Sequence, residues 1–492
     1  MLAVACRLPL LGGEFIDFDD SILIYENRVI TRLSWPHLYE VLFTNFRGES
    51  QNPMHLANML NWAVGDGAYW TFAASNLVWF AGTIGVVYAF ARLFLADRGW
   101  ALVATAFFAF HTVNVDNIGW MSARCHLMGM PFALGSFVAW QRYRESAGRL
   151  QWAWFAVANV AVAIAIWNKF IYVGVIPGLL LYEIYVRRRI DRSLALDKIP
   201  LAGVAALFAL NPLVSGNANQ GLAKSGAELA TSFWTRVGLF VEYLGSLVVP
   251  RPTFLGAWFT AATGPFEPSY GLIALQLPPI LNLGLLGVFA AFLLWLWQRG
   301  IRAPLFVGAL AILFLLPSMG LRPGSPDVAF AFRYMLVPTV CFGVGLAAVG
   351  AASWERLHRG LRGVIASAFA LLLCAHMGMS AHQAGLWRSP EAQYQSCIQH
   401  FPVSTVCHQR LAELARREGR HLQAIAYLGE VERVRSQYAF RRSMRSAQRL
   451  AEIFALAGER DLERFFIERA LLRDKLSREQ RHELRRRLRE LR

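Results

Sequence analysis

Residues 71–95, "TFAASNLVWFAGTIGVVYAFARLFL", form an apolar run whose one charged residue, Arg92, stands near its end. A helix needs about 20 mainly apolar residues to cross a bilayer, and this run is long enough. With 55% apolar residues, 16 Trp and 34 Phe in 492 residues, the composition is too apolar for an ordinary large soluble enzyme. Further apolar runs near spanning length occur at 100–113, 122–141, 151–167, 170–186, 199–214, 278–297, 303–318, 334–352 and 363–383.

These runs predict an all-α, polytopic membrane helical bundle of about eleven spanning helices. The count includes a first helix, "MLAVACRLPLLGG" at 1–13, which is too short to span and is interpreted as truncated or mis-started. We expect residues 1–384 to form this transmembrane domain. A first loop at 13–69 should carry short surface helices.

The loop charges assign each end of the bundle to a side, because short cytoplasmic loops are rich in Lys and Arg. Basic clusters at 142–149, 187–192, 298–302 and 355–362 are therefore expected in the cytoplasm. Alternation places four polar segments together on the opposite, extracytoplasmic face: the acidic stretch near residue 19, the loop at 111–124, the turn at Lys169 and the approach to Arg333. The stretch 229–250 would break this alternation if it spanned, so we interpret it as an interfacial or re-entrant helix.

The apolar runs stop near residue 385, and residues 385–492 are helical, charged and basic, with a net charge of roughly +9. "LAELARREGRHLQAI" from Leu411 aligns with "LAEIFALAGERDLER" from Leu450, so that Gly419 and Gly458 are equivalent. This repeat predicts a tetratricopeptide-like helical-repeat domain, extracytoplasmic by alternation. Its last helix could be simply solvated, or contact anionic lipid or a protein partner. Nucleic acid is not an expected partner, because the arginines alternate with glutamates.

The six cysteines contain no pair at CxxC spacing. Cys397 and Cys407, in "CIQHFPVSTVC", are separated by a short Pro-containing turn between two expected helices. A disulfide between them is one open possibility, and it requires that this region face an oxidising compartment.

Each polar segment alone has a simple structural explanation, such as a solvated acidic loop, a packed histidine or a lysine that reaches to the membrane interface. Their convergence on one face is more informative. Carboxylates, an imidazole and fixed cations at a membrane surface suit transfer of a group from an anionic lipid carrier to a hydroxyl.

The chain resembles a family through the order of five blocks and a helical-repeat tail. The blocks are "FIDFDDSILIYEN", "WPHLYEVLFTNFRG", "FHTVNVDNIGWMSAR", "NKFIYVGVIPGLLLYE" and "FRYMLVP". In this order they are similar to the transmembrane-and-tetratricopeptide O-mannosyltransferases and their bacterial relatives, of the GT-C glycosyltransferase superfamily. The resemblance implies an inverting enzyme in a bacterial inner membrane, with its site and tail in the periplasm. It implies a polyprenyl-phosphate-linked sugar donor and a protein or peptide acceptor that is glycosylated on a hydroxyl.

The resemblance also implies roles for particular residues. Asp19 or Asp20 would be the catalytic carboxylate, with Asp17 in support, and a divalent cation could bind at Asp19 and Asp20. Lys169, Arg124 and Arg333 would hold the donor phosphate, with Tyr334 beside them. The family's loop between its third and fourth helices corresponds to a supporting set formed by His111, Asp116 and Trp120.

Three positions depart from the family pattern: Asn52 where relatives commonly have Arg, Thr112 where they often have Pro, and His126 where they often have an acidic residue. The departures put the choice of donor in question more than the type of reaction. Two other functions remain open from the sequence, a membrane transporter or export component and a catalytically silent scaffold that presents the repeat domain. Transporters place polar residues near the bilayer midplane, whereas these clusters fall at helix ends, which favours the enzyme.

Overall fold

The computed structural model describes residues 1–16, 19–43, 51–187, 197–204, 206, 226–252, 257–260, 277–316, 327–400, 402, 404–438, 446–456, 458–473 and 477–491. The described residues before Pro390 form one compact unit, and those from Pro390 onward form a second. Each unit is described by itself.

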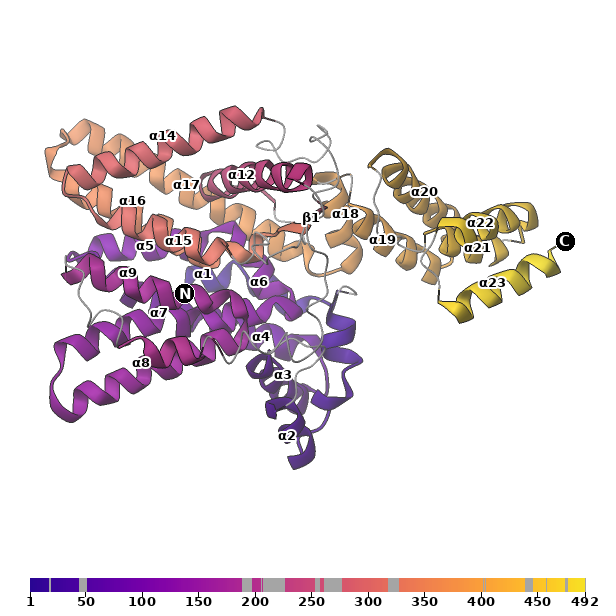
Figure 1. The fold of residues 1–492 in the computed structure, drawn as a ribbon, viewed down its shortest axis with the longest axis horizontal. Helices are drawn as coiled ribbons and strands as arrows, with labels where there is room; N and C mark the ends of the chain where they lie inside the picture. The colour runs from indigo at the N-terminus through magenta and orange to yellow at the C-terminus, as the bar shows by residue number, and fades with distance from the viewer. Residues whose placement is uncertain are drawn as a thin grey trace. The chain divides into compact units, whose positions relative to one another are not determined.

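The first unit is built almost entirely of helices (Figure 1). Its long helices are α4 (Tyr69–Ala91), α5 (Arg98–Phe110), α7 (Arg124–Glu145), α8 (Gly148–Asn168), α9 (Val175–Arg187), α12 (Gly226–Val248), α14 (Pro279–Gln298), α15 (Ala303–Leu315), α16 (Leu336–Ser353) and α17 (Arg359–Leu386). Shorter elements connect them: α1 (Leu2–Ala5), η1 (Leu8–Gly12), η2 (Ser21–Tyr25), η3 (Arg28–Ile30), α2 (Trp35–Phe43), α3 (Asn52–Gly65), η5 (Thr112–Asn114), α6 (Val115–Gly119), η6 (Met121–Ala123), η7 (Phe170–Gly174), η9 (Phe332–Met335) and η10 (Trp354–Arg356).

The predicted class, an all-α membrane protein, is confirmed. In the described part of the chain, six helical segments are long and apolar enough to cross a membrane, at 69–91, 148–168, 170–187, 279–298, 332–356 and 359–386. The runs at 100–113 and 303–318 form shorter apolar helices. Most of the run at 122–141 lies in the helix α7, which is not among the six. Most of the run at 199–214 falls outside the described residues. The helix α12, which covers the predicted interfacial stretch, is also not among the six.

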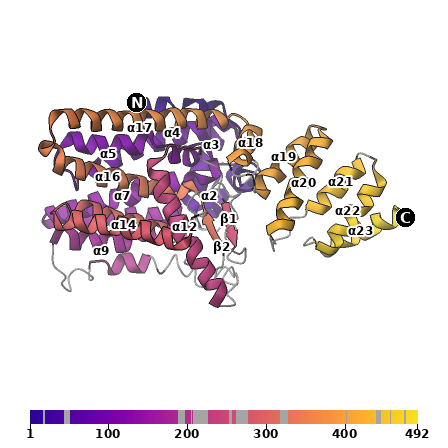
Figure 2. The same ribbon diagram turned by 90° about the horizontal axis from the view of Figure 1, so that it is seen from above.

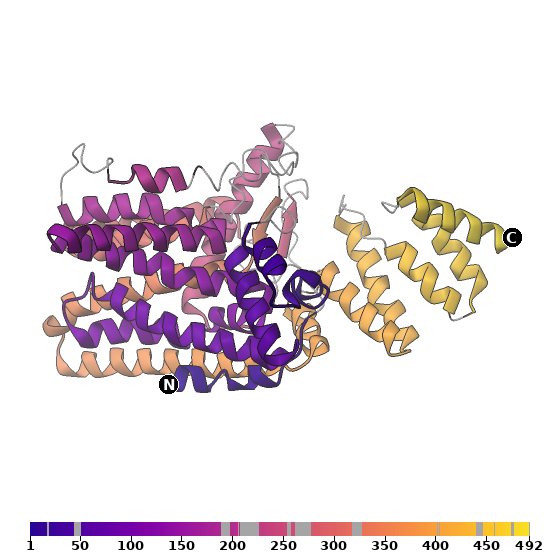
Figure 3. The same cartoon turned by 90° about the horizontal axis from the view of Figure 1, so that it is seen from below.

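Small residues let the spanning helices approach one another closely, as is usual in membranes. A side-chain carbon at Gly350 of α16 would lie 2.4 Å from the ring of Trp100, and one at Gly343 would lie 2.9 Å from the Ala104 carbonyl oxygen. Both neighbours belong to α5, so glycine at these two positions allows α16 to pack on α5. The N-terminal segment, drawn in indigo, packs against α4 and α17 (Figure 3).

β structure among the described residues is limited to one antiparallel ladder of β1 (Ala257–Thr260) and β2 (Asp327–Phe330), in which Ala257 is opposite Phe330. The ladder ends directly before η9, the short turn of helix that carries Arg333. It therefore fixes the approach to a predicted site residue.

The second unit consists of successive helices, labelled in Figure 2. They are α18 (Pro390–His400), α19 (Thr405–Arg417), α20 (His421–Tyr438), α21 (Ser446–Leu456), α22 (Arg460–Arg473) and α23 (Arg478–Glu490). The predicted repeat of helix pairs is present. Gly419 and Gly458 both adopt positive φ, +73° and +76°, where the first helix of each pair ends. The turns match in detail, because Arg420 N donates to the Ala415 carbonyl (2.8 Å) as Glu459 N donates to the Phe454 carbonyl (2.9 Å).

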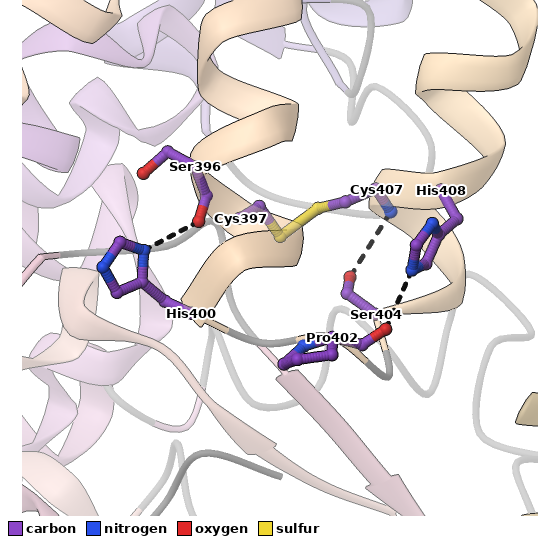
Figure 4. The surroundings of a disulfide bond; sticks show 7 residues. All are labelled: Ser396, Cys397, His400, Pro402, Ser404, Cys407 and His408. Carbon is purple, nitrogen blue, oxygen red and sulfur yellow. Dashed lines mark hydrogen bonds between the residues drawn. A yellow bond between two sulfur atoms is a disulfide. The ribbon is translucent and has the colours of Figure 1, made fainter. Parts of the chain in front are cut away.

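Cys397 and Cys407 form a disulfide that joins the end of α18 to the start of α19 (Figure 4). Their Cα atoms are 6.4 Å apart. Ser404 caps α19 by accepting from Cys407 N at 3.3 Å, which holds the second cysteine at the helix start.

Candidate active site

A pocket of about 290 Å³ lies where several helix ends of the first unit meet. It brings together three of the four polar segments that loop alternation places on one face: the acidic stretch, the turn at Lys169 and the approach to Arg333. Part of the fourth segment, the loop at 111–124, also lines it. Its lining is Asp19, Ile22, Leu23, Gln51, His55, Trp120, Ser122, Ala123, Cys125, His126, Lys169, Arg333 and Tyr334. Residues separated by more than 300 positions in the sequence therefore share one cavity.

The two adjacent carboxylates of the acidic stretch have different surroundings. Asp19 lines the pocket, whereas Asp20 does not and is fully buried behind it. Asp20 accepts hydrogen bonds from Ser122 N at 2.9 Å, from the Ser122 hydroxyl and from Ile16 N at 3.2 Å. Burial raises the pKa of Asp20 to about 7, although these hydrogen bonds oppose the rise. Asp20 thus fastens the turn that presents Asp19.

Two predicted cations, Lys169 and Arg333, line the same pocket as Asp19. Lys169 stands where α8 ends, in an extended conformation with φ −159°, before η7 begins. The Arg333 guanidinium lies over the rings of Trp120 and Tyr334, 5.1 Å from each centroid. Such contacts hold a guanidinium flat against the aromatic rings.

The backbone before Arg333 is anchored by Tyr243 of α12. The Tyr243 hydroxyl accepts from Ala331 N at 3.2 Å and lies 3.5 Å from the Ala331 carbonyl oxygen, to which it donates. Tyr243 is completely buried. The helix α12, which lies far from η9 in sequence, therefore positions the segment that presents the cation.

Helix geometry adds positive potential to the pocket. The helices α3, α7 and α16 all begin beside it, after Gln51, Ala123 and Met335 respectively. The N-terminal end of a helix carries a partial positive charge and unsatisfied N–H groups, so it favours anions. The end of α8 at Lys169 contributes the opposite partial charge, so the positive potential comes from three helix starts against one helix end, together with Lys169 and Arg333.

Other predicted site residues lie outside this pocket lining. Arg124 is fully buried and donates to Asn58 (2.8 Å) and Ser75 (2.7 Å), so it connects helices instead of facing the cavity. His111 is also fully buried, with its Nε2 3.2 Å from the Leu247 carbonyl oxygen. Asp116 is buried in α6, and Asp17 lies outside the described residues.

Gln51 and His55, for which the sequence pattern predicts no role, line the pocket from the start of α3. The neighbouring Asn52 accepts from Trp167 Nε1 at 3.0 Å and donates to the Val41 carbonyl at 2.6 Å, which ties α3 to α8. The signal was visible in "QNPMH", where polar residues flank a proline at a helix start. His126, noted as a departure from the family pattern, also lines the pocket.

A divalent cation at Asp19 and Asp20 fits this arrangement poorly. The Asp20 carboxylate already accepts from three donors and does not reach the pocket, so the pair does not present two carboxylates to one ion. Across the described ranges, no group of three or more His, Cys, Asp or Glu side chains is arranged to hold a metal.

The fold is that of a polytopic helical membrane protein, and its pocket places two cations next to a carboxylate. The chain matches no family model. It is 23% identical over 202 residues to human Protein O-mannosyl-transferase TMTC2, covering 38% of this chain and 24% of the human protein. It is 23% identical over 211 residues to the mouse protein of the same name, covering 40% and 25%. The chain thus spans about a quarter of the length of the curated relatives it matches.

Proposed function

We propose that this protein is a membrane glycosyltransferase that moves a sugar from a polyprenyl-phosphate-linked donor to a hydroxyl on a protein or peptide. The observation that carries the proposal is the meeting of Asp19, Lys169 and Arg333 in one pocket at the end of a membrane bundle. The names of the two relatives, both O-mannosyl-transferases, support the same class of reaction.

In the proposed mechanism Asp19 is the general base. The acceptor hydroxyl oxygen attacks the anomeric carbon of the sugar while Asp19 takes its proton. The bond between that carbon and the phosphate oxygen breaks, and its electron pair leaves with the lipid phosphate. One displacement of this kind inverts the anomeric configuration.

Lys169 and Arg333 act on the leaving group. Negative charge develops on the lipid phosphate as the bond to the sugar breaks, and fixed cations at that point stabilise the transition state more than the ground state. Trp120 and Tyr334 hold the guanidinium of Arg333 in place. Asp20 acts through Asp19, because its hydrogen bonds to Ser122 fix the turn, and it is a positioning residue.

The proposal places the pocket and the helical-repeat unit outside the cytoplasm, in the periplasm of a bacterium. The basic loops at the other end of the bundle support this side assignment. The disulfide between Cys397 and Cys407 supports it independently, because disulfides persist in oxidising compartments. The repeat unit would bind the acceptor or a partner protein, since stacked helix pairs form extended surfaces that suit peptides.

The test is transfer of radiolabelled sugar from a panel of polyprenyl-phosphate sugars, with mannose included, to a peptide pool by the purified protein in lipid nanodiscs. Asp19→Asn keeps the size of the side chain and removes its basicity, so transfer should fall by about 100-fold to 10,000-fold while donor binding persists. Lys169→Gln should weaken donor binding as well.

Two control variants change the same residue types away from the pocket. Asp97→Asn alters an exposed carboxylate that caps α5, and Asn caps a helix equally well. Arg142→Gln removes a cation whose side chain is 61% exposed. Both should retain full transfer. If Asp19→Asn transferred sugar as fast as Asp97→Asn from a donor that the wild type uses, the assignment of the base would be wrong.

A further inference from the structure

A second polar cluster lies at the other end of α7 and α9, far from the pocket. Its centre is Glu183 of α9, whose side chain is completely buried. Trp140 Nε1 donates to the Glu183 carboxylate at 2.5 Å, and the Arg187 side chain pairs with it at 2.5 Å. Arg144 forms a further ion pair with the same carboxylate. One buried carboxylate thus gathers two arginines from two helices.

A third cation, Lys198, completes the cluster. Its side chain extends over Trp140, with Nζ 4.4 Å from the ring centroid. Lys198 is only 6% exposed, and its ammonium has no hydrogen-bond acceptor among the described residues. Burial lowers the pKa of Lys198, although the nearby Glu183 opposes the shift. A buried ammonium has three N–H donors to satisfy, so this site lacks an acceptor.

Among the described residues, the charges of the cluster do not balance. Arg144, Arg187 and Lys198 contribute three positive charges, against the negative charges of Glu183 and of Asp197, which lies 3.9 Å from Arg187. Glu183 is paired with both arginines, and both carboxylates attract Lys198 without accepting a hydrogen bond from it. No described residue accepts a hydrogen bond from the Lys198 ammonium, and the phosphate of a bound lipid would supply that acceptor.

The distance between the cluster and the pocket along α7 indicates which part of the membrane would supply that anion. His126 of the pocket and Arg144 of the cluster stand on the same helix, and the rise between them is about 27 Å at 1.5 Å per residue. A bilayer's hydrocarbon core is about 30 Å thick. A pocket at one headgroup level thus puts the cluster at the headgroup level of the other leaflet.

The neighbouring surface is apolar and exposed. Trp152 is 64% exposed on α8, beside the end of α7, and Val186 and Leu180 of α9 are exposed as well. Acyl chains would cover such side chains in a membrane, and Trp is enriched at the membrane interface. A phosphate at Lys198 would therefore have lipid tails next to it.

We propose that Lys198, with Arg144 and Arg187, binds the phosphate of an anionic phospholipid in the leaflet opposite the pocket. The phosphate oxygens accept from the Lys198 ammonium and from the outer N–H groups of the arginines. The lipid then links the ends of α7 and α9. Basic recesses between membrane helices recognise anionic headgroups in this way. This inference does not depend on the proposed glycosyltransferase activity.

Native mass spectrometry of the detergent-solubilised full chain tests the proposal. Phosphatidylglycerol and phosphatidylcholine are titrated separately into the delipidated wild type. We expect phosphatidylglycerol to bind at least about tenfold more tightly. Lys198→Met keeps the apolar stem over Trp140 and removes the charge, and it should weaken phosphatidylglycerol binding at least about fivefold. A thermal unfolding curve of the lipid-free variant shows that it is folded, so that a loss of lipid binding is distinguished from a loss of structure.

A matched pair of arginine variants provides the control. Arg144→Gln removes a cluster cation and should weaken binding, whereas Arg142→Gln, two residues away on the same helix, removes an exposed one and should not. Equal phosphatidylglycerol affinities for Lys198→Met and the wild type would overturn the site. Equal binding of the two lipids would also overturn it. If inorganic phosphate alone at millimolar concentration saturated the site and phosphatidylglycerol added nothing, the assignment to lipid would be wrong.

Discussion

Asp20 makes the stability of this protein depend on pH in a direction unusual for a carboxylate. Burial raises its pKa from an ordinary 3.8 to about 7. Between these two values the folded protein holds a proton on Asp20 that the unfolded chain has released. The free energy of unfolding therefore falls as pH rises through this interval, and it is constant with respect to this group above about pH 7.

The size of the effect follows from the displacement of the pKa. One proton bound only by the folded state gives a slope of at most about 1.4 kcal/mol per pH unit. Raising the pH from 5 to 8 crosses about two units of the active interval, so the wild type should lose about 3 kcal/mol from this group. The side chain of Asp20→Asn cannot titrate, so this variant lacks the dependence of unfolding free energy on pH that Asp20 causes. It should be less stable than the wild type at pH 5, because its NH₂ group faces the N–H of Ile16.

The assay is unfolding of both proteins in mixed micelles of increasing SDS content, followed by tryptophan fluorescence at several pH values from 5 to 8. The free energy of unfolding of the wild type, minus that of Asp20→Asn, should decrease by about 3 kcal/mol over this pH range. Asp97→Asn, which alters an exposed carboxylate at the start of α5, serves as the control, and it should keep the slope of the wild type. A difference that stays constant with pH would refute the reasoning and would mean that Asp20 is ionised in the folded protein throughout.

Three further outcomes follow from the structure. Tyr243→Phe leaves the Ala331 N–H without its acceptor and loosens the segment before Arg333, so donor kcat/KM should fall about tenfold while the protein still folds, as circular dichroism would verify. Cys397→Ser should lower the stability of the helical-repeat unit by about 2 to 3 kcal/mol in non-reducing chemical denaturation of the full chain, and equal stability would contradict a formed disulfide. Gly419→Ala should destabilise the repeat unit by about 1 kcal/mol, because φ is positive at Gly419, whereas Gly429→Ala, inside α20, should stabilise it. The same denaturation curves test this, and effects of the same sign for the two variants would contradict it.

The helices and the repeat could be predicted because their signals are local. An apolar run at 71–95 specifies a spanning helix by its length alone, and Gly419 and Gly458 mark equivalent turns because each repeat ends its first helix in the same way. Gly343 and Gly350 carry no such local signal, because their role in close helix packing becomes visible only when α5 lies against them.

The pocket could be predicted only in part, because tertiary contacts decide where a side chain points. Asp19 and Asp20 are adjacent in the sequence, yet one faces the cavity and the other is buried by Ser122. Arg124 is as basic as Arg333, but polar partners on α3 and α4 draw it away from the lining. No spacing rule distinguishes these cases before the packing of distant segments is known.

The disulfide at the start of the repeat unit gives its unfolding a direction. In the second unit each helix packs mainly on its neighbours in sequence, as in other linear arrays, so such a unit can come apart one helix pair at a time. The covalent link between α18 and α19 prevents separation at one end, whereas α23 is held at the other end by a small apolar cluster around Leu484. Amide hydrogens of α22 and α23 should therefore exchange with solvent before those of α19, and thermal unfolding would proceed from the C-terminal helices toward α18.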